Sequence, residues 1–104
     1  MRVVLVTIPT GSGEEMARLL VEREVCACVN VLPGARSFYK DEGELKRKDE
    51  ELLVIKVAEA DIGVLRTMVL ENHPYDTPEF VALEVDIHSS DNDYVRWVRY
   101  ATRM

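Results

Sequence analysis

The two cysteines, Cys26 and Cys28, lie one residue apart in the segment EVCACVN, a spacing that suggests metal binding or redox chemistry. A soft thiolate is a good ligand for copper and zinc, whereas a free cysteine on an apolar strand is commonly a small core residue. If the segment is a strand, both side chains point the same way, about 6.6 Å apart along the rise. A disulfide requires Cβ atoms roughly 3.5–4.5 Å apart, so we expect two free thiols.

Histidine supplies a second kind of metal ligand. His73 directly precedes Pro74, and because the residue before a proline disfavours helical backbone, a helix is expected to end there. The imidazole is a general ligand for copper and zinc. At a helix C-terminus the same side chain can instead serve the exposed carbonyls as a cap, so both functions stay open for His73. His88 lies in the polar segment IHSSDND and is expected to be an exposed loop residue.

Lys56 interrupts the apolar run LLVIKV, and a lysine within a central strand needs a carboxylate partner or an opening to water. Glu79 or Glu84, from the other apolar strand, is the expected partner. Lys56 is therefore either half of a structural ion pair at a subunit boundary or an anion-accepting group in a cleft between subunits. Tyr39 and Tyr75 are expected either as walls of such a cleft or as packing anchors.

Sequence signatures of enzymes are missing. The chain has no G-x-S-x-G, H-E-x-x-H or C-x-x-C motif and no phosphate-binding glycine loop. The glycines of TGSGEE follow an apolar run and open a helical pattern, as they would in a phosphate-binding turn. Glu14 and Glu15 would repel a phosphate at that position. We therefore assign no catalytic residue.

The composition limits the possible partners. With 104 residues the chain is expected to form one domain, residues 1–104. Its net charge of −6, without a lysine or arginine cluster free of acidic neighbours, argues against nucleic acid and anionic membranes as partners. No apolar run approaches the roughly 20 residues of a bilayer-spanning helix, and MRVVLVTIPTG has the pattern of a strand rather than a signal peptide. A cytoplasmic location is expected.

Hydrophobic periodicity predicts the elements that must position these side chains. Short β-branched apolar runs indicate strands, and amphipathic patterns indicate helices. The expected N-terminal caps are Ser12 (in a capping box with Glu15), Asp61 and Ser90. The expected elements are strands at 3–8, 25–32, 51–57 and 80–87, helices at 14–24, 62–72 and 91–101, and a hairpin over 35–50 that turns at KDEG.

The two halves of the chain repeat one strand–helix pattern, offset by about 49 residues. A duplicated βαβ unit closes most simply into a ferredoxin-like α+β fold, an antiparallel sheet with helices on one face. Pro33 and Gly34 are expected to end the second strand. Strand 51–57 is apolar on both sides, so the second face of the sheet must also be covered. In so small a chain the expected cover is another subunit.

The segments CACVNVLPGARSFYKDEGEL and ENHPYDTPEFVALEVD, followed by DYVRWV, resemble the CutA family of divalent-cation tolerance proteins. The family pattern has Cys-Val-Asn after a helix ending in Glu-Arg, then Pro-Gly, then Ser-x-Tyr before a Glu-Gly turn. Later it has His-Pro-Tyr followed closely by Pro-Glu. The matching positions here are Cys28-Val29-Asn30, Pro33-Gly34, Ser37, Tyr39, Glu42-Gly43, His73-Pro74-Tyr75 and Pro78-Glu79.

The resemblance implies a homotrimer of ferredoxin-like subunits, similar to PII-type signalling proteins, with clefts between subunits. It also implies a link to copper and other divalent cations and no established catalytic reaction. Family members commonly have alanine at the position of Cys26, which makes Cys28 the candidate metal ligand, with His73 as the second. They often have aromatic residues where this chain has Lys40 and Asp41, which weakens any aromatic pocket at that turn.

The sequence therefore predicts a non-enzymatic, copper-type cation-binding protein that acts as a homotrimer in metal tolerance. The competing interpretation is a PII-like signalling or scaffold protein. Such a protein would bind a small molecule or an unknown protein partner in its intersubunit clefts. The residues expected to line those clefts are Tyr39, Lys56, Tyr75 and Glu79.

Overall fold

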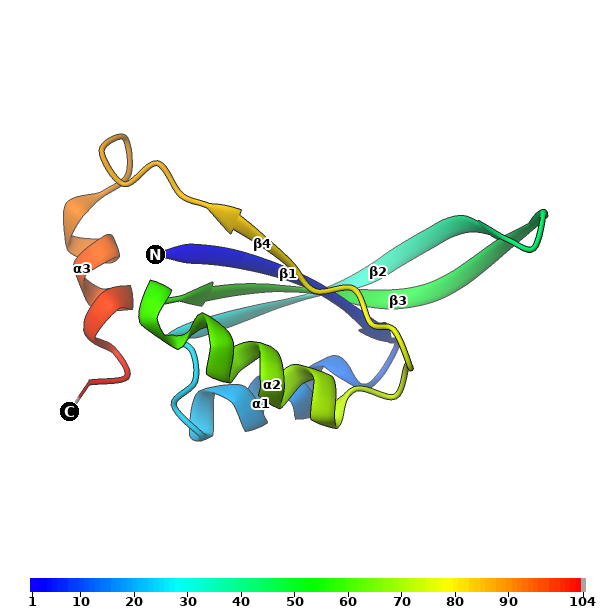
Figure 1. Ribbon diagram of the computed structural model, residues 1–104, viewed down its shortest axis with the longest axis horizontal. Helices are drawn as coiled ribbons and strands as arrows, with labels where there is room; N and C mark the ends of the chain where they lie inside the picture. The colour runs from blue at the N-terminus through cyan, green and yellow to red at the C-terminus, as the bar shows by residue number, and fades with distance from the viewer. Residues whose placement is uncertain (104) are drawn as a thin grey trace.

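The computed structural model describes residues 1–103 and contains one sheet and three α-helices (Figure 1). Within this part of the chain no helix is long and apolar enough to cross a membrane. The elements in chain order are β1 (Arg2–Pro9), α1 (Gly13–Glu22), β2 (Cys28–Asp41), β3 (Glu44–Val57), the 3₁₀ turn η1 (Glu59–Asp61), α2 (Ile62–Asn72), β4 (Val81–Glu84) and α3 (Asn92–Tyr100).

The four strands form an antiparallel sheet in the order β2-β3-β1-β4. This order is that of a duplicated βαβ unit, so the predicted ferredoxin-like α+β fold is confirmed. Helices α1 and α2 lie side by side on one face of the sheet, and α3 stands at the end where β1 begins (Figure 1). The central strands β1 and β3 are paired along their shared length, Arg2 opposite Val57 through Pro9 opposite Glu50.

The core lies between the sheet and the two helices. Alternate residues of β1 and β3 point toward the helices, because side chains alternate faces along a strand. These residues, with the apolar faces of α1 and α2, are almost completely excluded from solvent. The principal members are Val4, Val6, Ile8, Leu20, Leu53, Ile55, Val57, Leu65 and Val69.

Helices α1 and α2 do not cover the opposite face of the sheet (Figure 1), and α3 reaches it only at one end, where the side chain of Tyr94 contacts Cys28. We call this opposite face the open face. On β1 and β3 its residues are mostly apolar and half-buried, apart from Thr7 and the buried Lys56, and residues toward both edges are more exposed. The members from the four strands are Val3, Leu5, Thr7, Leu52, Val54, Lys56, Cys28, Asn30, Leu32, Val81 and Leu83. One chain alone leaves this apolar surface in contact with water.

Strands β2 and β3 form a long hairpin whose distal part extends beyond the rest of the sheet (Figure 1). We call residues 35–41 and 44–49 the arm, because β1 pairs only with residues 50–57 of β3. The chain reverses at Glu42 and Gly43, which both have positive φ angles, 50° and 80°. This combination is typical of a two-residue hairpin turn with the twist of its strands. The predicted hairpin is confirmed.

The predicted end of the second strand at Pro33 and Gly34 is wrong. The pairing of β2 with β3 resumes at Ala35 after a register shift, so these two residues form a bulge within one continuous strand. Gly34 has a φ angle of 81°, which accommodates the extra residue. Proline lacks a backbone donor, and at a bulge no ladder hydrogen bond is lost.

Two other strand boundaries differ from the expected ones. The second strand begins at Cys28 rather than Val25, and Val25 and Cys26 are buried in the core ahead of it. The last strand covers only residues 81–84, and it is exposed rather than half-buried because it is an edge strand without a helix over it. It ends where the Asp86 carboxylate accepts the backbone N–H groups of His88 and Ser89 and turns the chain.

The first helix is capped from a distant strand. Ser12 has helical backbone angles and its side chain makes no capping hydrogen bond, so the predicted capping box is wrong. The N–H of Gly13 instead donates to Oε1 of Glu51 on β3, at 2.8 Å. A carboxylate at this end of a helix also interacts favourably with the helix dipole. The Glu51 carboxylate occupies the position that a phosphate would take in a phosphate-binding turn.

The other two predicted caps also differ. Asp61 precedes α2 but does not cap it, and its carboxylate binds Thr102 and Arg103 near the C-terminus. Those bonds, the one to Arg103 foremost, lower the pKa of Asp61. Helix α3 is capped by Asp91, which accepts the N–H of Tyr94 at 2.9 Å, while the predicted cap Ser90 donates to the carbonyl of Asp86.

We expect Gly13→Ala to destabilise the fold by about 1–3 kcal/mol, as overpacking commonly does. An alanine Cβ there would lie 2.6 Å from Oε1 of Glu51 and 2.9 Å from Cγ1 of Val31. Gly63→Ala in α2 is the matched control, because its Cβ would meet nothing within 4 Å. That change should raise the free energy of unfolding by about 0.5–1 kcal/mol, because alanine has a higher helix propensity than glycine. Urea unfolding of both variants measures the difference, and equal effects of the two would contradict the close approach at Gly13.

Candidate functional sites on the open face and at the base of the arm

Cys28, Asn30 and Lys56 form a polar cluster on the otherwise apolar open face. Cys28 on β2 lies directly opposite Lys56 on β3, and Asn30 lies opposite Val54. The ammonium group of Lys56 donates to Oδ1 of Asn30 and to the carbonyl oxygen of Val54, the latter at 3.4 Å. Lys56 is only 8% exposed, and these acceptors replace the water that it loses.

The predicted carboxylate partner of Lys56 is wrong, because the acceptor is the amide of Asn30. Glu84 is exposed on β4, where its register partner is Arg2. Glu79 is exposed in the segment before β4 and forms no ion pair within residues 1–103. A neutral acceptor leaves the positive charge of Lys56 uncompensated on the open face.

The two cysteines occupy different environments. Cys26 precedes β2 and is buried in the core, whereas Cys28 is half-buried on the open face, so they do not share a strand face as expected. Burial, and then the neighbouring Cys28 sulfur, raise the pKa of Cys26 to about 12. Cys26 is therefore a neutral thiol at physiological pH, and the thiolate is the form that binds metals. Cys28 is the less buried thiol, and it contacts the side chain of Tyr94 on α3, where burial and then the Cys28 sulfur raise the pKa of Tyr94.

His73 is fixed by hydrogen bonds through both ring nitrogens. Nε2 lies 2.8 Å from the carbonyl oxygen of Thr7, and Nδ1 lies 3.1 Å from the backbone nitrogen of Tyr75. The carbonyl accepts and the amide donates, so the ring is protonated on Nε2 and accepts through Nδ1. The residue is 9% exposed. His73 therefore donates a hydrogen bond to β1 and does not cap the end of α2. At that helix end the side chain of Asn72 donates to the carbonyl of Met68.

Cys28 and His73 do not meet within one chain. In the sheet, Cys28 lies opposite Lys56, and Lys56 lies opposite Val3 of β1. His73 binds the carbonyl of Thr7, which is four residues further along β1. Four residues of strand span about 13 Å. Across residues 1–103, no three histidine, cysteine or acidic side chains converge as a metal site would require. A complete metal shell in this chain therefore needs ligands beyond these two residues.

A second cluster lies at the base of the arm. The Tyr75 hydroxyl donates to Oε2 of Glu50 at 2.9 Å, and Glu50 is only 3% exposed. The Lys48 ammonium lies 3.9 Å from the centre of the Tyr75 ring and 5.6 Å from that of Tyr39, within the range of cation–π attraction. The His73 ring packs against Tyr75 at 4.8 Å. We call these five residues the arm-base cluster.

The arm-base cluster brings together two of the four predicted cleft residues, Tyr39 and Tyr75, while Lys56 lies on the open face. Lys48 and Glu50 lie within the predicted hairpin over 35–50, but the sequence did not single them out as site residues. The hairpin register contained the signal for Lys48. With the turn at residues 42–43, Tyr39 pairs with Lys46 and Ser37 with Lys48, so Lys48 is a diagonal neighbour of Tyr39.

Burial and the Glu50 carboxylate raise the pKa of Tyr75 to about 12. In a pH titration followed by phenolate absorbance, we therefore expect one ionisation near pH 12 that the Tyr75→Phe variant lacks. Between pH 10 and 12 the unfolded chain releases a proton that the folded chain keeps, so the contribution of Tyr75 to stability falls as the pH rises. If the ionisation that the variant lacks occurs near pH 10, the ordinary range of tyrosine, the Tyr75–Glu50 contact would be contradicted.

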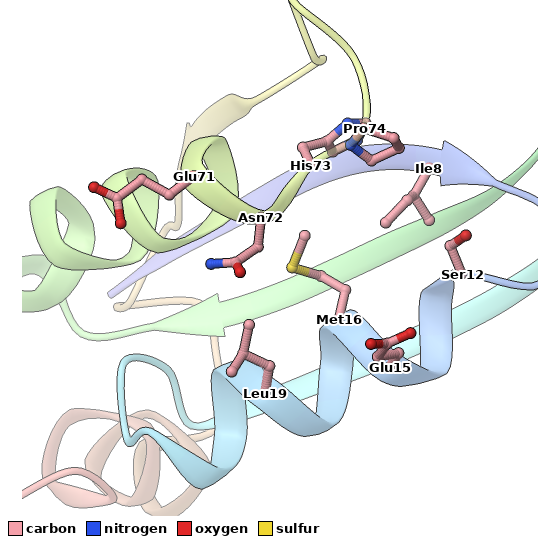
Figure 2. Close-up of a pocket in the computed structure, with 9 residues that line it drawn as sticks. All are labelled: Ile8, Ser12, Glu15, Met16, Leu19, Glu71, Asn72, His73 and Pro74. Atoms are coloured by element: carbon pink, nitrogen blue, oxygen red, sulfur yellow. The ribbon is translucent and has the colours of Figure 1, made fainter.

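The groove between the two helices also contains His73. This groove has a volume of about 350 Å³. Figure 2 shows its lining residues between α1 and the end of α2. Ile8, Met16 and Leu19 provide its apolar floor, and its rim carries Glu15, Glu71 and other polar groups. The bonds of His73 to Thr7 and Tyr75 use both of its nitrogens. The groove therefore offers no free imidazole to a ligand.

Comparison with known proteins gives one consistent match. The family model described as CutA1 divalent ion tolerance protein matches residues 2–101. A divalent-cation tolerance protein CutA from Pectobacterium atrosepticum is 38% identical over 102 residues, covering 97% of this chain and 91% of the relative. A chloroplastic CutA protein from Arabidopsis thaliana is 37% identical and covers 97% of this chain. The chain spans about half the length of that plant relative, 55%.

The solved structures give the same result. A PII-like CutA protein from Nostoc sp. PCC 7120, in its apo form, superposes with a TM-score of 0.93 at 40% sequence identity. The match covers 99% of this chain and 98% of the Nostoc chain. The agreement includes the arm, α3 and the sheet order, because nearly every residue of both chains takes part.

Proposed function

The chain belongs to the CutA1 divalent ion tolerance family, and from this membership we propose that it is a non-enzymatic homotrimer that binds divalent cations, copper above all, in tolerance of metal ions. The observation that carries the metal part is the free, half-buried Cys28 thiol on the open face. We place the protein in the cytoplasm, where thiols stay reduced, because the proposal requires a free Cys28.

Cys28 supplies the soft ligand that copper prefers. Cys28 lies directly opposite Lys56 on the neighbouring strand. His73 contributes as the second ligand after Nδ1 gives up the N–H of Tyr75. Because Cys28 and His73 lie apart in one chain, the trimer supplies the remaining ligands from neighbouring subunits or solvent.

The two cysteines provide a matched test of copper binding. We expect Cys28→Ser to weaken copper binding in calorimetric titration by at least about 10–100-fold, because that loss already follows from removing groups that only orient the ligands. Cys26→Ser makes the same chemical change at a buried, neutral thiol and should leave binding unchanged. His73→Ala reports on the second ligand. Unchanged binding in both Cys28→Ser and His73→Ala would overturn the proposed ligand set.

The open face supports the homotrimer. Its apolar residues on four strands are exposed or half-buried in one chain, and apolar surfaces of this kind mark contact sites between proteins. A second copy supplies a matching apolar face, as closed symmetric assemblies do. Light scattering measures the assembled mass, and a value near the single-chain 11.9 kDa would overturn the trimer.

The arm-base cluster favours a second function, in which the protein is a PII-like sensor or scaffold. Tyr39 and Tyr75 present aromatic faces beside a lysine and a buried carboxylate, a combination typical of small-molecule sites. Lys56 and Glu79 complete the proposed cleft from other parts of the assembly. A thermal-shift screen of metabolites tests it, because a ligand of the folded state raises its melting temperature. If a metabolite raises the melting temperature equally in the protein and in Tyr75→Phe, its binding site does not include the arm-base cluster.

A further inference from the structure

A pocket of about 300 Å³ lies between α3 and the loop that precedes it. Figure 1 shows this region at the end of the molecule opposite the tip of the arm. The floor of the pocket is apolar and consists of Ile87 and the buried Val95. The polar groups that line it are His88, Asn92, Arg96, Arg99 and Tyr100.

The lining of this pocket is cationic, and no carboxylate residue is part of it. Arg96 and Arg99 are three residues apart on α3, a spacing that places both guanidinium groups on one side of the helix. Arg99 forms no ion pair within residues 1–103. Arg96 has only a long contact of 3.7 Å with the exposed Asp93. The Arg99 guanidinium is therefore open to a ligand, and that of Arg96 has only this exposed partner to exchange for one.

Two acidic residues on the loop before α3, Asp86 and Asp91, bind backbone N–H groups. The Asp86 carboxylate accepts the N–H groups of His88 and Ser89 at 3.1 and 3.2 Å. The Asp91 carboxylate accepts the N–H of Tyr94 at the start of α3. These bonds fix the loop, so the position of His88 relative to α3 is set before any ligand arrives.

We propose that this pocket binds the dianionic head group of a phosphate monoester. A guanidinium group offers a planar fork of donors that matches phosphate oxygens. Two such groups complement a tetrahedral dianion better than they complement a planar carboxylate with one charge. His88, Asn92 and Tyr100 add hydrogen-bonding groups around the rim. The apolar floor of Ile87 and Val95 contacts the organic part of the ester. Because the whole chain carries a charge of −6, this attraction is local and weakens with salt.

Calorimetric titration of the full chain with phenyl phosphate and with inorganic phosphate tests the proposal. We expect saturable binding of phenyl phosphate that is tighter than that of inorganic phosphate. The double variant Arg96→Gln/Arg99→Gln should weaken phenyl phosphate binding at least tenfold. The control Arg18→Gln/Arg66→Gln removes two exposed arginines from α1 and α2 and should have no effect. Absence of saturable binding, or equal losses in the two variants, would overturn the site.

Two further outcomes are decisive. Equal affinity for the two phosphates would overturn the assignment to an ester, because the apolar floor would then contribute nothing. The double variant should retain the melting temperature and the assembled mass of the original protein, since both arginines are exposed in the chain. A lower mass would show that the arginines bind a neighbouring copy instead, and it would overturn the proposal.

Discussion

Val54→Asp is expected to reduce the assembled protein to single chains of 11.9 kDa in light scattering. Val54 lies on β3 in the middle of the open face, with Leu5 and Asn30 opposite it on the neighbouring strands. In the proposed trimer this position is covered by another subunit. A carboxylate there would be buried beneath that subunit. The Lys56 ammonium on the same face already binds Asn30 and the Val54 carbonyl, so it would offset only part of a desolvation cost on the order of several kcal/mol.

The control for this experiment is Val64→Asp, the same change on the exposed surface of α2. It should leave the mass of the assembly unchanged, because α2 lies on the other side of the sheet (Figure 1). An assembly that survives Val54→Asp, or dissociates equally in both variants, would contradict association through the open face.

Tyr75→Phe is expected to cost about 3 kcal/mol of unfolding free energy, because a buried charged group that loses its hydrogen bond pays a large desolvation penalty. Glu50 is almost fully buried, and its hydrogen bond comes from the Tyr75 hydroxyl. The aromatic ring itself remains in the variant, so its packing with His73 and Lys48 persists. Urea unfolding at neutral pH measures the loss.

Two further variants separate the Tyr75–Glu50 bond from a general effect of removing a hydroxyl. Tyr100→Phe makes the same change at an exposed tyrosine and should alter stability by less than about 0.5 kcal/mol. Glu50→Gln in the Tyr75→Phe background removes the buried charge and should recover part of the loss. If the double variant is less stable by the full sum of the single losses, the two groups are not coupled.

The fold was predictable because its elements follow strong local patterns. Apolar β-branched runs correspond to β1 and β3, and the Glu-Gly turn corresponds to the hairpin reversal at Glu42 and Gly43. Even the open face was foreseeable, because strand 51–57 has apolar residues on both sides. Short-range periodicity was therefore enough to identify the repeated βαβ unit, and that repeat predicts the sheet order.

The errors in the predicted fold came from interactions between residues far apart in the sequence. Ser12 has the sequence signature of a cap, yet the N–H at the helix start binds Glu51, 38 residues away. Pro33 and Gly34 have the signature of a strand end, yet pairing with β3 continues past them. Local sequence propensity does not show whether a distant residue will provide the helix cap or continue the strand pairing.

The candidate sites were only partly predictable for the same reason. The resemblance favoured Cys28 over Cys26 as the candidate ligand, but the burial of Cys26 in the core was not visible in the sequence. Tyr75 was a candidate, whereas its partner Glu50 lies 25 residues earlier and is brought near by a loop. The acceptor for Lys56 proved to be an amide on the adjacent strand rather than a carboxylate.

The Glu51–Gly13 contact has a consequence for the order of folding. A ten-residue helix is marginal on its own in water, and α1 has no local cap to help it. Its capping carboxylate reaches it only when β3 has taken its place beside β1. Helix α1 therefore cannot act as an early nucleus. It becomes stable in the same cooperative step that closes the sheet, so this helix and the centre of the sheet should lose hydrogen-exchange protection together.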